Sequence, residues 1–227
     1  MHAEVSELVI GAEPSAWERV GLPTRGGQGQ LGRIRLRFDP SRDGIASLGI
    51  SGFTGDDDAL RAAFDGLPVH TAAAVESPAA PNDLDCEGIE LLSIFTSSAT
   101  RTARAIEAAT GSAPARVREH SGMVMGYVSL GTTQAEVVES ADAPVDAATV
   151  GGMIIIVSDL AALSARLGPD LISEPRLAVQ YERQIATFRP AAALGMPIAA
   201  MTPAPGYSPT PEQVADWRAR RAAATRP

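Results

Sequence analysis

The stretch Ile89–Gly111 (IELLSIFTSSATRTARAIEAATG) decides the fold prediction, because it contains a short apolar strand, a polar turn and a helix closed by glycine. The same kind of unit occurs at Glu7–Gly21, Ala46–Gly66 and Gly152–Gly168. One unit of this size is too small to bury its own apolar face. We therefore expect the units to pair, and their paired sheets to form shared concave surfaces.

The composition is that of an ordinary globular protein and excludes several classes of function. The net charge is −8, whereas binding to nucleic acid requires a basic surface. All 19 basic residues are arginine, which excludes Schiff-base chemistry on lysine. Cys86 is the only cysteine and cannot form an internal disulfide, which favours a reducing compartment. With no signal-peptide pattern and no apolar stretch long enough for a bilayer, we expect a cytoplasmic protein without a membrane or nucleic-acid partner.

The chain divides at Val75–Gly88, where prolines, glycines and acids predict a linker, which we place at 81–88. Residues 1–80 then form a degenerate pair of units, residues 89–203 a fuller pair, and residues 204–227 a tail with a short helix. In the fuller pair, the first helix is followed by three predicted strands: 115–120, 123–130 and 134–139. The second helix is expected at about 159–167, with strands at 153–157, 184–189 and 197–202. The fold class is therefore α+β.

The clearest additional strand of the N-terminal pair is Arg33–Asp39 (RIRLRFD). Arginines alternate with apolar residues there, which predicts one buried face and one basic face. The basic face either holds an anionic ligand or is the solvated side of a half-buried strand.

The C-terminal pair resembles a known family. GIELLSIFTSSATRTARAIEAATG, ARVREH, GMVMGYVSLG and AEVVES are similar to a βαβββ module of the glyoxalase/bleomycin-resistance/dioxygenase superfamily, also called vicinal oxygen chelate (VOC) proteins. VGGMIIIVSDLAALSARLG and ERQIATFRPAAALGMPIAAMT resemble the second module of bacterial glyoxalase-like domains. The resemblance implies paired βαβββ modules that form a cup-shaped sheet with the helices outside. It also implies a divalent metal in the cup, chelated by the substrate.

The family's metal ligands are mostly absent from the matching positions. Its histidine falls at Leu91 and its glutamate at Glu136, while the second module offers only apolar residues or glycine at 152–156 and 198–201. A zinc site needs at least three protein ligands. We therefore expect no family metal and no other cofactor.

Glu136 is the candidate catalytic residue. If it faces the cup, a carboxylate with little hydration is suited to general acid–base chemistry; if it faces outward, it has no such role. We expect one of Arg183 and Gln184, which alternate along one strand, to point into the cup. The predicted ligand-binding residues are Leu91, Ser93, Phe95, Met125, Tyr127, Ile154, Arg183, Gln184 and Met201.

Three functions remain open. The first is metal-independent isomerase or lyase chemistry on a small, largely apolar organic ligand, with Glu136 as the acid or base. The second is a non-catalytic protein that binds or sequesters an antibiotic or a metabolite. The third is an interaction protein whose cup is filled by its own side chains. Either a monomer or a homodimer is compatible with the sequence.

Overall fold

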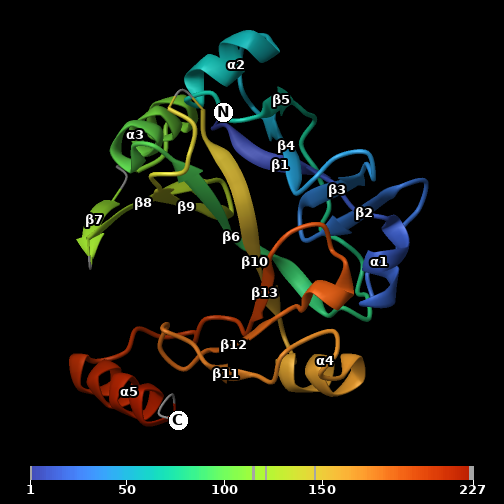
Figure 1. The fold of residues 1–227 in the computed structure, drawn as a ribbon, viewed down its shortest axis with the longest axis vertical. Helices are drawn as coiled ribbons and strands as arrows, with labels where there is room; N and C mark the ends of the chain where they lie inside the picture. Colours follow the sequence, from blue (N-terminus) through green and yellow to red (C-terminus); the bar gives the residue numbers. More distant parts are fainter. Residues whose placement is uncertain (1, 114–115, 121, 146, 225–227) are drawn as a thin grey trace.

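The computed structural model describes residues 2–113, 116–120, 122–145 and 147–224. Within these residues two curved sheets form the framework, a five-stranded sheet from the N-terminal half and an eight-stranded sheet from the C-terminal half. Figure 1 shows the two sheets side by side, with β6 and β10 running through the centre of the molecule. The predicted α+β class is confirmed.

The eight-stranded sheet consists of two βαβββ modules. The first contains β6 (Cys86–Thr96), α3 (Ala99–Thr110), β7 (Arg116–His120), β8 (Met123–Leu130) and β9 (Thr133–Glu139). The second contains β10 (Thr149–Val157), α4 (Leu160–Leu167), β11 (Arg176–Leu177), β12 (Gln184–Thr187) and β13 (Ile198–Met201). The strand order is β11-β12-β13-β10-β6-β9-β8-β7. The opening strands β6 and β10 therefore pair antiparallel in the middle, and each pairs in parallel with its own closing strand.

The five-stranded sheet repeats this plan in shortened form. Its first unit contains β1 (Glu4–Ile10), α1 (Pro14–Arg19), β2 (Gln28–Leu31) and β3 (Ile34–Phe38), and its second contains β4 (Ile45–Ser51), α2 (Asp57–Ala63) and β5 (Val69–Thr71). The order is β2-β3-β1-β4-β5, with β1 and β4 antiparallel and each parallel to its own closing strand. Within the described residues, one strand of the first unit and two of the second are missing relative to βαβββ. The predicted degenerate copy is confirmed.

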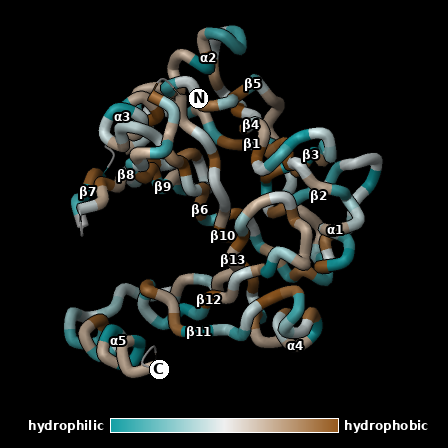
Figure 2. The backbone as a smooth tube through the Cα atoms, viewed as in Figure 1, coloured by the Kyte–Doolittle hydropathy of each residue, from teal (hydrophilic) through white to brown (hydrophobic). Residues whose placement is uncertain are grey.

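Buried side chains lie on the helix-facing sides of both sheets and join into one core. Figure 2 shows hydrophobic residues along β10 and β13 and around β1 and β4. The helix α3 begins after Ser98, whose hydroxyl accepts the amide of Arg101, and ends at Gly111 with a left-handed φ of 64°. Arg166 of α4 donates to the carbonyls of Val20 and Asp83, which ties the two halves together.

The tail ends in a helix, α5 (Pro211–Ala224), which is longer than the sequence predicts. It docks through Trp217, which is buried and donates from Nε1 to the carbonyl of Ala178 at 3.1 Å. None of the helices within the described residues combines the length and the apolar character that a membrane crossing requires.

The predicted linker at 81–88 is too long at its C-terminal end. β6 begins at Cys86, because the strand continues to pair with β10 as far as the contact between Cys86 and Val157. Cys86 is buried, and this burial raises the pKa of its thiol to about 12. The thiol is therefore protonated and unreactive at neutral pH.

Candidate functional site

The candidate site lies on the face of the eight-stranded sheet that points away from α3; we call it the C-terminal cup face. Gly126, Val137 and Ile94 lie in one row on the α3 side, and a Cβ atom at Gly126 would approach Ala103 of α3 within 2.8 Å. Side chains alternate along a strand, so the neighbouring positions point to the opposite face. The pairing registers place five of them in a row across β7, β8, β9, β6 and β10: Arg116, Tyr127, Glu136, Ser93 and Gly152.

Glu136 and Tyr127 form the polar centre of this row. The Tyr127 phenol donates to Oε1 of Glu136 at 2.8 Å, and both side chains are partly buried. Burial, together with the hydrogen bond to Glu136 and its charge, raises the pKa of Tyr127 to about 12. At neutral pH Tyr127 is therefore a neutral donor that faces a carboxylate.

Apolar side chains surround this pair on the same face. Leu91 is buried, whereas Met125 and Ile154 are half-buried and Phe95 is 37% exposed. The Phe95 ring lies over Gly151, where a Cβ atom would come within 2.1 Å of the ring. The face therefore presents an exposed aromatic ring close to a carboxylate, which is a suitable surface for a small organic molecule.

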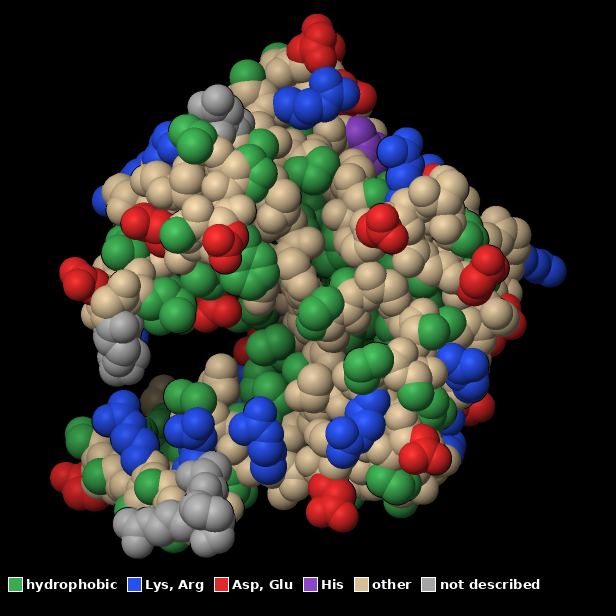
Figure 3. Space-filling view, viewed as in Figure 1, with side chains coloured by type: hydrophobic (Ala, Val, Ile, Leu, Met, Phe, Trp, Pro, Cys, Tyr) green, Lys and Arg blue, Asp and Glu red, His purple; other side chains and the backbone are tan. Residues whose placement is uncertain are grey.

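The cup face is open to solvent. Figure 3 shows the molecule hollowed between the region of β7 and β8 and the region of α5. At the β7 end of the face, a cavity of about 430 Å³ is lined by Tyr127 and by more polar residues: Arg116, Arg118, Ser129 and Gln134.

Comparison with known proteins identifies the fold. No family model and no curated protein matches the chain. A mutant of 4-hydroxymandelate synthase from Streptomyces coelicolor matches 96% of this chain and 99% of its own, with a TM-score of 0.54 and 13% identity. The 2,2',3-trihydroxybiphenyl 1,2-dioxygenase from Sphingomonas wittichii matches 89% of this chain and 91% of its own, with a TM-score of 0.54 and 12% identity.

The fold is that of the VOC superfamily. The resemblance inferred from the sequence is therefore confirmed at the level of the fold. Methylmalonyl-CoA epimerase from Mycobacterium tuberculosis also matches, over 53% of this chain and 91% of its own, but with a TM-score of only 0.42 and 15% identity.

The positions at which the sequence resemblance places the metal ligands do not fit a divalent cation. The row next to Glu136 contains Leu91, Ile154 and Ala199, whose side chains have no donor atoms, and Gln134, whose amide oxygen is a weak ligand. In the described part of the chain, no three residues of the types His, Cys, Asp and Glu are grouped closely enough to hold a metal ion. Glu136 alone does not make the three-ligand set that zinc requires.

Arg183 is engaged in the protein itself. Its Nη1 donates to Glu90 at 2.6 Å, its Nη2 donates to the other oxygen of Glu90, and its Nε donates to the carbonyl of Thr202 at 2.7 Å. Its side chain is 5% exposed. Arg183 therefore anchors β12 to β6, and its burial leaves its remaining N–H groups little access to a ligand.

The sequence does not reveal Glu90 as the partner of Arg183. The pairing of β6 with β10 skips from Ile89 to Leu91, so Glu90 occupies a β-bulge that the sequence pattern does not signal. Gln184 and Ile185 point to opposite faces of β12, and Gln184 lies on the face turned away from the C-terminal cup face. Met201 is only 1% exposed. The expectation that Gln184 and Met201 contact a ligand is not supported by this placement.

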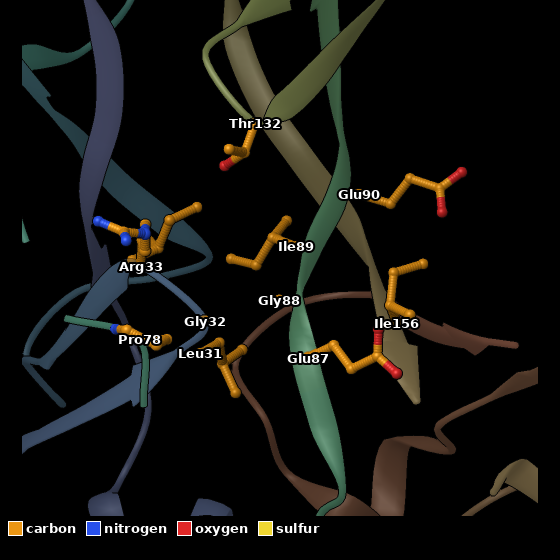
Figure 4. Close-up of a pocket in the computed structure, with 11 residues that line it drawn as sticks. Leu31, Gly32, Arg33, Pro78, Glu87, Gly88, Ile89, Glu90, Thr132 and Ile156 are labelled. Atoms are coloured by element: carbon orange, nitrogen blue, oxygen red, sulfur yellow. The ribbon is translucent and has the colours of Figure 1, made fainter. Parts of the chain in front are cut away.

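A second cavity, of about 420 Å³, lies where the two halves meet. In Figure 4, Ile89 points toward Arg33, whereas Glu87, Glu90 and Ile156 point to the other side of β6. The lining residues do not include Glu136 or Tyr127. We therefore assign the site to the cup face and treat this cavity as part of the junction between the halves.

Proposed function

We propose that the C-terminal cup face binds a small, largely apolar organic molecule and acts on it through Glu136 without a metal. The observation that carries this proposal is the contact between the Glu136 carboxylate and the Tyr127 phenol among apolar side chains. Neighbours that match nearly the whole chain are named for 4-hydroxymandelate and trihydroxybiphenyl, both small aromatic compounds. This supports a ligand of that size.

The chemistry is a proton transfer of the isomerase or lyase type. Oε1 of Glu136 accepts the Tyr127 phenol, and Oε2 is the oxygen that takes a proton from a carbon next to a substrate carbonyl. The electrons of the broken C–H bond move onto the carbonyl oxygen, and the single O–H of Tyr127 turns from Oε1 of Glu136 to donate to this oxygen. Because the pKa of Tyr127 is raised, the phenol stays protonated and serves as a donor. Glu136 then returns the proton to another atom of the substrate.

The alternative is a non-catalytic protein that sequesters an antibiotic or a metabolite. The exposure of Phe95 and Met123, at 37% and 47%, favours this possibility, because an open apolar surface binds without enclosing its ligand. In that case the Tyr127–Glu136 pair fixes the orientation of the ligand and transfers no proton.

The substitution Glu136→Gln separates the two functions. Native mass spectrometry of freshly purified protein identifies a retained molecule, and NMR follows whether the protein converts it. For an enzyme, we expect Glu136→Gln to lower turnover by roughly 100-fold or more while affinity changes by less than about threefold. For a sequestering protein, the wild type shows no turnover, and the substitution weakens binding instead.

Glu119→Gln is the matched control, because Glu119 is exposed and alternates with Arg118 onto the other face of β7. It is expected to change neither turnover nor affinity. Metal analysis of the same sample tests the metal-independent mechanism. A stoichiometric divalent ion whose removal abolishes binding or turnover would contradict the proposal.

A further inference from the structure

The concave face of the N-terminal sheet contains a polar cluster that the proposed function does not use. Its centre is Glu7 of β1, whose side chain is only 10% exposed. Oε2 of Glu7 accepts from Arg35 at 3.1 Å, and Oε1 accepts from Arg37 at 3.3 Å and from Nε2 of His70 at 3.1 Å. Ser47 lies 2.6 Å from the other ring nitrogen, Nδ1 of His70. We call these five residues the N-terminal cluster.

The hydrogen bonds define the role of each group in the cluster. Burial opposes ionisation of Glu7, but the hydrogen bonds from Arg35, His70 and Arg37 lower the pKa of Glu7 below its usual value. An ionised carboxylate only accepts hydrogen bonds, so Nε2 of His70 carries a proton. With His70 neutral, Nδ1 then accepts the hydroxyl of Ser47.

The sheet provides space for this cluster at Gly49. Pairing places Arg35, Glu7, Gly49 and His70 in one row across β3, β1, β4 and β5. A Cβ atom at Gly49 would lie 2.6 Å from Cβ of Glu7 and 3.1 Å from Nε2 of His70. The absence of a side chain at Gly49 therefore allows Glu7 and His70 to meet across the strand between them.

The charges of the cluster favour an anion. Two arginines face one carboxylate, which leaves a net charge of at least +1. Each arginine uses one nitrogen on Glu7, and among the described residues no protein acceptor is bonded to the remaining nitrogens of these two guanidinium groups. The side chains of Arg35 and Arg37 are 34% and 46% exposed, so these donors are accessible to solvent. Two arginines beside the carboxylate also oppose the binding of a cation.

We propose that Arg35, Arg37 and His70 form a second ligand site, which binds a small oxyanion, either a phosphate group or a carboxylate, above Glu7. Guanidinium groups bind both kinds of group with paired N–H donors. Glu7 holds the two arginines in place, and Ser47 orients the His70 ring. The site is distinct from the C-terminal cup face, since its residues come from β1, β3, β4 and β5.

The test is a titration of the full chain with inorganic phosphate and, separately, with acetate at constant ionic strength. NMR of the His70 ring protons, assigned with His70→Gln, reports binding at the site. We expect saturable shifts, and we expect Arg37→Gln to weaken the binding by about tenfold. The tighter of the two anions identifies the class of ligand.

Arg42→Gln is the matched control, because Arg42 lies in the turn between β3 and β4, is 66% exposed and pairs only with Asp39 among the described residues. It is expected to leave binding unchanged. Glu7→Gln removes the competing negative charge but keeps an acceptor oxygen for the arginines, and it is expected to strengthen binding by several-fold. The proposal is overturned if neither anion shifts His70 to saturation, or if Arg37→Gln and Arg42→Gln weaken binding equally.

Discussion

The two halves of the molecule build the same kind of module pair, yet their concave faces hold different chemistry. Both faces carry a carboxylate in the row that crosses the opening strands, Glu7 in the N-terminal half and Glu136 in the C-terminal half. Glu7 is held by two arginines and a histidine, whereas Glu136 meets one neutral phenol. Glu7 lies on an opening strand and Glu136 on a closing strand, and the neighbours of each carboxylate decide what it does.

The type of partner explains the difference. Cationic and polar donors lower the pKa of Glu7 despite burial, which leaves its carboxylate ionised and held by three hydrogen bonds. At Glu136 the donor is Tyr127, whose own pKa is raised. We infer that Glu7 mainly organises its face and that Glu136 acts on a ligand.

The largest expected difference is in stability. Glu7→Ala leaves Arg35, Arg37 and His70 without their common acceptor, and we expect the free energy of unfolding to fall by about 2 kcal/mol. This is less than the cost of breaking a fully buried pair, because both arginines are partly exposed. Glu136→Ala is expected to cost less than about 1 kcal/mol, since it removes one hydrogen bond at a half-buried position. Urea unfolding measures both, and equal losses would contradict the division of roles.

The second largest effect is expected from a matched pair of glycine substitutions, which we compare by their loss of stability. The Cβ atom of Gly49→Ala would meet Cβ of Glu7, which cannot move without its strand, so we expect a loss of about 1–2 kcal/mol. The Cβ atom of Gly151→Ala would meet the Phe95 ring, which is exposed and can rotate away. Gly151→Ala should therefore cost less than Gly49→Ala and change ligand affinity at the C-terminal cup face. Thermal unfolding of both variants tests this order.

The smallest effect is a dependence on pH. Because the pKa of Glu7 is lower in the folded protein, the stability that its ionisation contributes is present above the unfolded-state pKa of about 4.3. This contribution is lost as the pH falls through the folded-state pKa. We expect the difference in unfolding free energy between the wild type and Glu7→Gln to shrink on acidification from pH 6 to below about pH 4. A difference that stays constant over this range would show that ionisation of Glu7 does not contribute.

The C-terminal half could be predicted well from the sequence because its elements are long and well marked. The predicted strands at 123–130 and 134–139 closely match β8 and β9, and α3 ends at the predicted glycine. The sequence does not predict β2, β5 and β11, which have two to four residues and no apolar alternation long enough to mark a strand.

The candidate site was only partly predictable. Glu136 was found because a motif resemblance marks its position, and the alternation of residues along β9 left two possible faces. Glu90 was hidden by a bulge, and Glu7 by its place beside an apolar run. The partners of Glu7 lie 28, 30 and 63 residues further along the chain, and only the sheet brings them together.

Crystallographic screening of the full chain with small aromatic and aliphatic fragments tests the central claim most directly. We predict that apolar fragments gather on the C-terminal cup face, in contact with Phe95 and within hydrogen-bonding distance of Glu136. Fragments that instead gather on the N-terminal concave face, or that avoid Glu136 altogether, would contradict the account.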